Sequence, residues 1–320
     1  MTGLFSIRVT VSLLLLAAIP ACAQEPTKSF HVKFNWKAAD FFDDPQVIAL
    51  CKAIEANDLK EMERLIKDGA DVNAKGKGNM TPLLWAFPDN KPERFKLLLE
   101  MGADPNVVIE SNFGIPAGMM APGECVTEMT AKSKFPLLFE EVMKHGGDPH
   151  FVNKTTKRSL LITLIRNGGK QAQSRVQLLI DKGVDVNDPS SKTPPVIVAA
   201  TASHQFDLAL TLLKAGADPK RYIDDGDMKL THVLLGAEEN VYKKYNSPET
   251  QASYEKLVAW LKDHGESFEE AQRDLDRWKK RAHLPAEEIG RLRRAEIAER
   301  KAREAAEKAK KEEANKEKKP

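Results

Sequence analysis

The chain has 320 residues, of which 42% are hydrophobic and 30% charged, and its formal net charge is +2. This length supports one long domain or two ordinary ones around a sizeable apolar core. A net charge so close to zero gives no electrostatic reason to expect nucleic acid or a membrane surface as a partner of the whole chain. The three cysteines and seven histidines lack metal-ligand spacing, so we expect no metal site and no other cofactor.

Residues 1–23 have the pattern of an export signal. Arg8 precedes an apolar run over residues 9–19, and small residues surround an expected cleavage point after Ala23. The run is shorter than the roughly 20 apolar residues that a membrane-spanning helix needs. We therefore expect a periplasmic or secreted protein that starts at Gln24.

A second processing outcome competes with this cleavage. The segment Ile19-Pro20-Ala21-Cys22 resembles the lipobox of bacterial lipoproteins, which implies a lipid on Cys22 and an outer-membrane location. The sequence departs from that pattern at Ile19 and Pro20, so we favour soluble release. Membrane association is expected only if Cys22 is lipidated. Residues 24–45, which follow, are interpreted as an N-terminal linker.

A short motif recurs along the middle of the chain: a glycine followed two residues later by Asp in five of six copies. Apolar residues stand three, four and seven positions before most of these glycines, which is the spacing of one face of an α-helix. Glycine past a helix end adopts the left-handed conformation without a Cβ penalty, and Asp organises the following turn. The glycines are Gly69, Gly102, Gly146, Gly183, Gly216 and Gly265, at intervals of 33, 44, 37, 33 and 49 residues.

A first helix is predicted before each of these glycine-terminated helices. Thr81-Pro82 opens one such helix, with Thr as the cap and Pro at the first helical position. A single helix pair of this size cannot bury its apolar face alone, so neighbouring pairs must stack. We predict about six helix-turn-helix units over residues 46–268.

Charged residues dominate the C-terminal end. Residues 269–284 are predicted to form an amphipathic helix that caps the last unit. From residue 269 onward there are 17 Lys and Arg against 13 Asp and Glu, and the interspersed Glu residues argue against a basic helix that binds nucleic acid or membrane. Residues 285–320 are expected to be a charged tail, either a solvated helix or disordered.

The 33-residue interval, the Thr81-Pro82-Leu83-Leu84 opening and the turn from Gly69 to Asn73 resemble the ankyrin repeat family. The resemblance covers residues 46–268. It implies an all-α, ankyrin-like repeat solenoid with a charged C-terminal helical extension. It also implies that turn fingers and first helices form a concave face that binds a partner protein.

The partner surface is expected on the first finger, the helix after it and the insertion at residues 107–124. Insertions in repeat arrays often lie on the binding face, and flexible Met suits adaptable surfaces. Two alternatives stay open: the insertion plugs the edge of the solenoid, and Trp85 packs in the core. The candidate contact residues are Lys75, Lys77, Asn79, Met80, Trp85, Phe87, Phe113, Met119 and Met120.

No catalytic motif is present: there is no G-x-S-x-G and no phosphate-loop spacing, so we expect no enzymatic activity. Cys51 and Cys125 lie about two repeats apart, too far for a disulfide unless the loop before Cys125 folds back. We interpret the chain as a monomeric, non-catalytic interaction module of the bacterial envelope. It would act as an immunity or inhibitor protein for a toxic effector, or alternatively as a lipid-anchored structural, scaffold or protector protein.

Overall fold

The computed structural model describes residues 29–116, 120–133, 136–188, 192–201, 204–223, 226–245 and 247–317. The expected signal peptide, Cys22 and Met119 lie outside these residues. The described chain is mostly helical, with one short two-stranded sheet. None of its helices is both long and apolar enough to cross a membrane.

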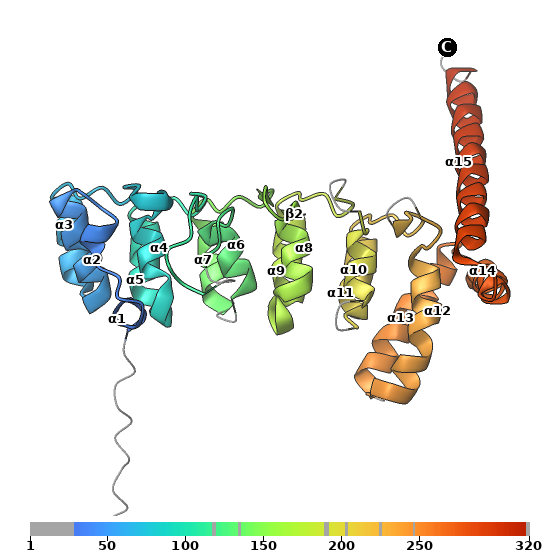
Figure 1. Ribbon diagram of the computed structural model, residues 1–320, viewed down its shortest axis with the longest axis horizontal. Coiled ribbons are helices and arrows are strands. Elements are labelled where there is room, and N and C mark those ends of the chain that lie inside the picture. Colours follow the sequence, from blue (N-terminus) through green and yellow to red (C-terminus); the bar gives the residue numbers. More distant parts are fainter. Residues whose placement is uncertain are drawn as a thin grey trace, which may run out of the picture.

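Six helix pairs stand side by side in chain order (Figure 1). The pairs are α2 (Pro45–Ala56) with α3 (Leu59–Lys67), α4 (Pro82–Ala86) with α5 (Pro92–Glu100), α6 (Val126–Lys132) with α7 (Pro136–Lys144), α8 (Leu160–Asn167) with α9 (Ala172–Asp181), α10 (Pro195–Thr201) with α11 (Phe206–Lys214), and α12 (Leu230–Glu239) with α13 (Pro248–Asp263). First helices pack on first helices, such as α6 on α8 and α8 on α10, and second helices pack alike. The predicted array of about six units is therefore present.

Shorter elements complete the chain. Between the helices lie the 3-10 turns η2 (Lys77–Asn79), η3 (Pro88–Asn90) and η4 (Gly169–Gln171), the strands β1 (Val152–Asn153) and β2 (Arg158–Ser159), and the π-helical turn η6 (Asn240–Tyr245). The predicted cap of α4 is confirmed, since the Thr81 hydroxyl accepts a hydrogen bond from the Leu84 amide at 3.2 Å.

The turns between pairs, here called fingers, share one hydrogen-bonding scheme. In the first finger the Asp71 carboxylate accepts the backbone N–H of Asn73 at 2.8 Å, which closes the turn. The Asn73 amide then donates to the carbonyl of Gly102 at 2.9 Å, and its oxygen accepts the N–H of Asp104 at 2.7 Å. The same bridge runs from Asn106 to the third finger and from Asn187 to the fifth. The recurring Asp thus shapes the turn, and in three fingers the Asn that follows links it to the next finger.

The segment before the array is folded, which corrects its interpretation as a linker. Residues 29–44 contain α1 (Phe30–Lys33) and the 3-10 turn η1 (Ala38–Asp40), and α1 lies against the first pairs (Figure 1). The aromatic side chains of Trp36 and Phe42 are buried in the common core. Because this segment buries apolar surface on the array, it belongs to the same folded unit.

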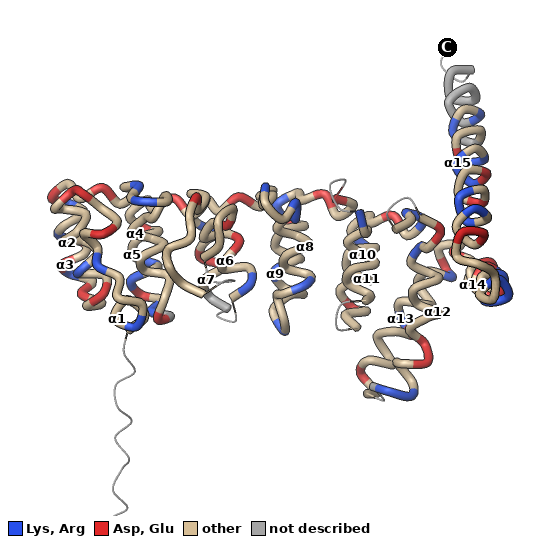
Figure 2. The backbone as a smooth tube through the Cα atoms, in the orientation of Figure 1, with Lys and Arg blue, Asp and Glu red and all other residues tan. Residues whose placement is uncertain are grey.

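Two helices follow the last pair. The first, α14 (Phe268–Arg281), packs on α12, and the second, α15 (Ala286–Glu317), projects beyond the finger side of the array (Figure 1). Lys or Arg alternates with Asp or Glu along α15 (Figure 2). Its side chains are exposed or half-buried wherever the structure describes them, so it is a surface helix.

Candidate functional site

The first finger is partly accessible, as a partner site requires. Lys75 and Lys77 are exposed, and Phe87 at the end of α4 is half-buried. Asn79 is also half-buried and adopts a left-handed backbone (φ 62°). Its amide donates to the carbonyl of Val108 at 3.0 Å, so Asn79 ties the first finger to the second and is not free for a partner.

Four other predicted contact residues are buried, which corrects their assignment to a partner surface. Met80 and Trp85 are fully buried, and Phe113 and Met120 are at most 7% exposed. The cover comes from the N-terminal segment and from residues 107–116 and 120–124 of the insertion, which fold down onto the array. Of the two alternatives for the insertion, the structure shows the plug; for Trp85 it shows core packing.

Trp36 is the centre of this cover. Its indole ring stacks on that of Trp85 with ring centroids 5.5 Å apart, and meets the rings of Phe41 at 5.3 Å and Phe113 at 5.9 Å. Its Nε1–H donates to the carbonyl of Phe113 at 3.1 Å. The inner face of the first units is therefore already occupied by the chain's own aromatic side chains.

A buried histidine joins the N-terminal segment to the array. The Nε2–H of His31 donates to the carbonyl of Trp85 at 3.0 Å, which leaves Nδ1 as the unprotonated nitrogen, 3.7 Å from the Asp89 carboxylate. Burial lowers the pKa of His31, and the nearby Arg94 guanidinium lowers it further. The Trp85 carbonyl and the Asp89 carboxylate raise the pKa, but by less than burial lowers it. His31 is thus held neutral in the folded protein.

Stability is expected to fall as the pH falls below about 6.5, the unfolded pKa of histidine. A lowered folded pKa means that the unfolded chain binds more protons between the two pKa values, so unfolding is favoured there. Burial lowers the pKa of His232 in the same direction. Unfolding midpoints across this pH range should therefore decline less steeply in His31→Gln, whose amide can still donate to Trp85; an unchanged slope would contradict the role of His31.

A hairpin extends the finger that follows α7. Strands β1 and β2 pair antiparallel, and Lys157 takes a left-handed backbone at the turn (φ 58°). The buried Asn153 side chain accepts the backbone N–H groups of Thr155 and Thr156 at 3.0 and 2.9 Å. Its amide donates to the buried carboxylate of Glu128 on α6 at 2.7 Å. One side chain thus shapes the hairpin and anchors it to the core.

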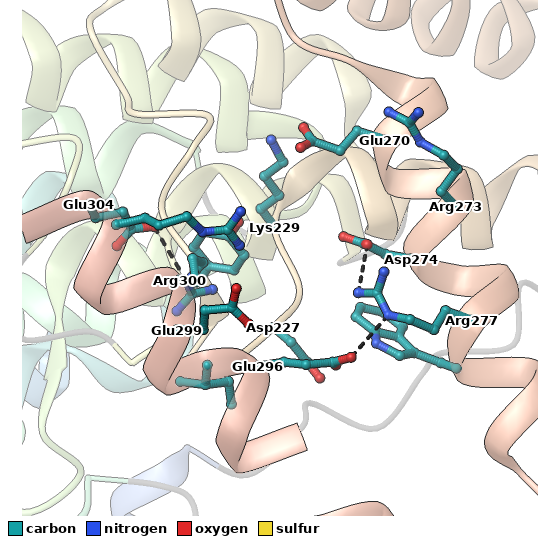
Figure 3. A pocket seen from close by; sticks show the side chains of 14 residues that line it. Asp227, Lys229, Glu270, Arg273, Asp274, Arg277, Glu296, Glu299, Arg300 and Glu304 are labelled. Atoms are coloured by element: carbon teal, nitrogen blue, oxygen red, sulfur yellow. Dashed lines mark ion pairs between the residues drawn. The ribbon is translucent and has the colours of Figure 1, made fainter. Parts of the chain in front are cut away.

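A cavity of about 610 Å³ lies where the last finger meets α14 and α15 (Figure 3). Two of its arginines form ion pairs with lining carboxylates: Arg277 bridges Asp274 at 2.8 Å and Glu296 at 3.1 Å, and Arg300 meets Glu304 at 3.4 Å. The basic lining residues are Lys229, Arg273, Arg277, Arg300 and Arg303, and the acidic ones are Asp227, Glu270, Asp274, Glu296, Glu299 and Glu304.

This cavity is a joint between α15 and the array. The Arg300 guanidinium lies 3.4 Å from the ring centroid of Tyr222 and donates to the carbonyl of Gly226 at 2.7 Å. Arg293 also pairs with Asp227. These contacts fix the base of α15 to the last finger.

A histidine–aspartate pair beside the cavity has the composition of a catalytic dyad. The Nε2–H of His232 donates to Asp274 at 3.3 Å, and its Nδ1 accepts the backbone N–H of Lys229 at 3.2 Å. The ring is buried and stacks on Trp278 at 5.2 Å. Because both ring nitrogens are engaged, neither can take a proton from a substrate; the pair links α12 to α14.

The two cysteines within the described residues are buried away from the surface. Cys51 and Cys125 are buried and free, and burial raises the pKa of both, that of Cys125 to about 12. A thiol with so high a pKa is a poor nucleophile at neutral pH. Within the described residues, no group of His, Cys, Asp and Glu side chains could hold a metal ion.

The N-terminal cover and the hairpin were both missed by the repeat pattern. A signal for the cover exists in the sequence, because Phe30, Phe34, Trp36, Phe41 and Phe42 crowd five aromatic rings into thirteen residues. Such a density is unusual in an exposed linker. The hairpin has no comparable signal, since its strands are two residues long and lie inside an interval of 37 residues.

Comparisons with known proteins give a short sequence match and two distant structural neighbours. No family model matches the chain. The human and bovine mitochondrial disaggregases are 42% and 41% identical to it over 59 residues, which is 18% of this chain and only 8% and 9% of theirs. The ankyrin repeat domain of Bcl-3 covers 68% of this chain at 19% identity and a TM-score of 0.49; that of human ASB11 covers 71% at 19% and 0.47. These matches include 86% of each domain.

The repeat architecture is evident in the chain's own geometry. Six stacked helix pairs, left-handed glycines after the second helices and Asp-closed fingers bridged by Asn make one repeated unit. The described chain is therefore an all-α, ankyrin-like repeat solenoid with a charged C-terminal helical extension.

Proposed function

We propose that this protein is a non-catalytic interaction module that binds a partner protein on its finger side. The hydrogen-bonded fingers support the proposal most directly, because Asn73, Asn106 and Asn187 each hold two successive fingers in fixed register. A rigid, repeated surface loses little conformational entropy on binding. Since the chain itself fills the inner face of the first units, the partner contacts the fingers and the later units.

The chemistry of the described residues supports a binding role. The buried thiols are poor nucleophiles, and both nitrogens of His232 are committed to structural hydrogen bonds. The charged cavity beside α15 is balanced and serves as a joint. An enzyme would instead concentrate unpaired, perturbed titratable groups in a cleft.

The setting is proposed to be the bacterial envelope, on the strength of the signal-like residues 1–23. A monomer that inhibits a toxic effector there is the role we favour. A lipid-anchored scaffold or protector, with the lipid on Cys22, is the alternative. The two roles differ in what binding does to the partner: an inhibited enzyme loses activity, whereas a protected one keeps its activity and gains stability.

One purification tests both binding and export. The full chain with a C-terminal affinity tag is expressed in its host and recovered from the soluble periplasmic and membrane fractions. We expect a single stoichiometric partner protein and a mature N-terminus at Gln24. Recovery of the tagged chain alone would contradict the interaction module. An acylated N-terminus at Cys22 would establish the anchored form.

A further inference from the structure

The hairpin at residues 152–159 carries three cations that form no ion pair with the described part of the chain. Lys154, Lys157 and Arg158 are all exposed. No carboxylate of the described residues lies within 4.0 Å of their charged nitrogens. The hairpin itself contains no acidic residue. Its strand β2 lies on the finger side of the array, next to α8 (Figure 1).

The cations are presented by a stiff frame. Asn153 is 1% exposed and links the hairpin to Glu128 on α6, whose carboxylate also lies 3.4 Å from the hydroxyl of Thr163 on α8. The other side of the hairpin touches the insertion, since a Cβ on Gly123 would come within 2.4 Å of the Thr155 hydroxyl. Because the hairpin backbone is already fixed, only the conformational entropy of its side chains is lost when a partner binds.

Exposed apolar side chains stand beside these charges. Val152 is 40% exposed at the start of the hairpin, and Val108 is 39% exposed at the equivalent place on the preceding finger, each six residues after its glycine. Asn106 bridges the two fingers through Gly146 and Asp148. The two valines therefore occupy equivalent positions on neighbouring fingers held in fixed register, and the three cations follow Val152 on the second of these fingers.

We infer that the strip of Val108 and Val152 with Lys154, Lys157 and Arg158 docks an acidic, partly apolar segment of a partner protein. The inference rests on the proposed function and specifies the chemistry of the partner. Unpaired cations attract carboxylates and speed association, while the valines bury apolar side chains. The phosphates of a nucleic acid or of a lipid surface would contact the cations, but neither partner would gain binding energy from valines on stiff turns.

The test compares three tagged full-length chains on extracts of the host envelope, at low and at high salt. One is unchanged, one carries Lys154→Gln, Lys157→Gln and Arg158→Gln, and the matched control carries Lys60→Gln, Lys91→Gln and Lys170→Gln. The control lysines are also exposed and unpaired, and they lie at the helix ends away from the fingers. Equal thermal midpoints would show that all three chains fold alike.

The unchanged and control chains are expected to retain the same protein at low salt and to lose most of it at high salt. The hairpin variant should bind that protein about tenfold more weakly, mainly through slower association. Equal retention by all three chains would overturn the inference and leave the proposed function standing. Retention of no protein by the unchanged chain would overturn both.

Two further probes identify the class of partner. Duplex DNA and vesicles of phosphatidylglycerol are offered to the same three chains. We expect neither to bind the unchanged chain at physiological salt. If either binds through the three cations while the retained protein does not need them, the strip is a nucleic-acid or membrane surface and the inference is wrong.

Discussion

Replacing Arg94 with Met is expected to lower the free energy of unfolding by about 3–5 kcal/mol. The Arg94 guanidinium is 1% exposed and donates to the carbonyls of Ile54 at 2.9 Å, Ala86 at 3.1 Å and Pro88 at 2.6 Å. These carbonyls lie in α2, at the end of α4 and in the turn after it. Methionine fills a similar volume but donates nothing, so three buried carbonyls lose a partner.

Urea unfolding followed by circular dichroism measures this loss. Lys96→Met on the same helix is the matched control, because Lys96 is exposed and makes only a surface ion pair with Glu100 at 3.6 Å. We expect the control to change stability by less than about 0.5 kcal/mol. If both variants lose the same free energy of unfolding, the hydrogen bonds of the buried guanidinium do not stabilise the helix ends.

A second buried arginine donates to helix-end carbonyls farther along the array. Arg175 on α9 is fully buried and donates to the carbonyls of Ala131 at 3.3 Å and Ser133 at 3.0 Å, at the end of α6. Arg94 and Arg175 both stand eight residues before a helix-stop glycine. The repeat alignment therefore contained this signal. The apolar positions alone do not indicate it, because a buried arginine interrupts an apolar pattern.

The features that could be predicted are those fixed by residues close together in the chain. A glycine after an apolar helix face must be left-handed, and Gly69, Gly102 and Gly216 are, with φ of 106°, 89° and 97°. The Asp two residues after the glycine closes the turn, because its carboxylate accepts the backbone N–H of the residue two positions farther along the chain. Because these contacts are local, the periodicity was enough to place the helix pairs and the fingers.

The candidate site could not be predicted in the same way, because contacts between residues far apart in sequence decide whether its side chains are exposed or buried. Trp85 and Met80 occupy positions that face a partner in a bare repeat array. Whether they do so here depends on Trp36, which lies 49 residues before Trp85 in sequence, and on Phe113 in an insertion. No period in the sequence encodes that pairing. The aromatic density of residues 30–42 indicates burial but does not say against what.

Replacing Trp36 with Ala is expected to release the N-terminal segment from the array. Loss of a buried Trp side chain costs about 3–5 kcal/mol, and here this loss weakens the packing of residues 29–42 on the array. A direct reporter is the Lys77 amide, which donates to the carbonyl of Phe41 at 2.9 Å and should lose its protection from hydrogen exchange. Binding of an apolar dye should rise as Trp85 and Met80 become accessible.

Val32→Ala is the matched control within the same segment. Val32 lies on α1 but is 62% exposed, so its truncation removes little buried surface and should leave the Lys77 amide protected. The array beyond the first units should stay folded in both variants, because its helix pairs bury their apolar faces on one another. If Trp36→Ala instead leaves the Lys77 amide protected, the aromatic cover does not hold the segment. If it unfolds the whole array at once, the segment is a structural part of the solenoid and cannot be opened separately.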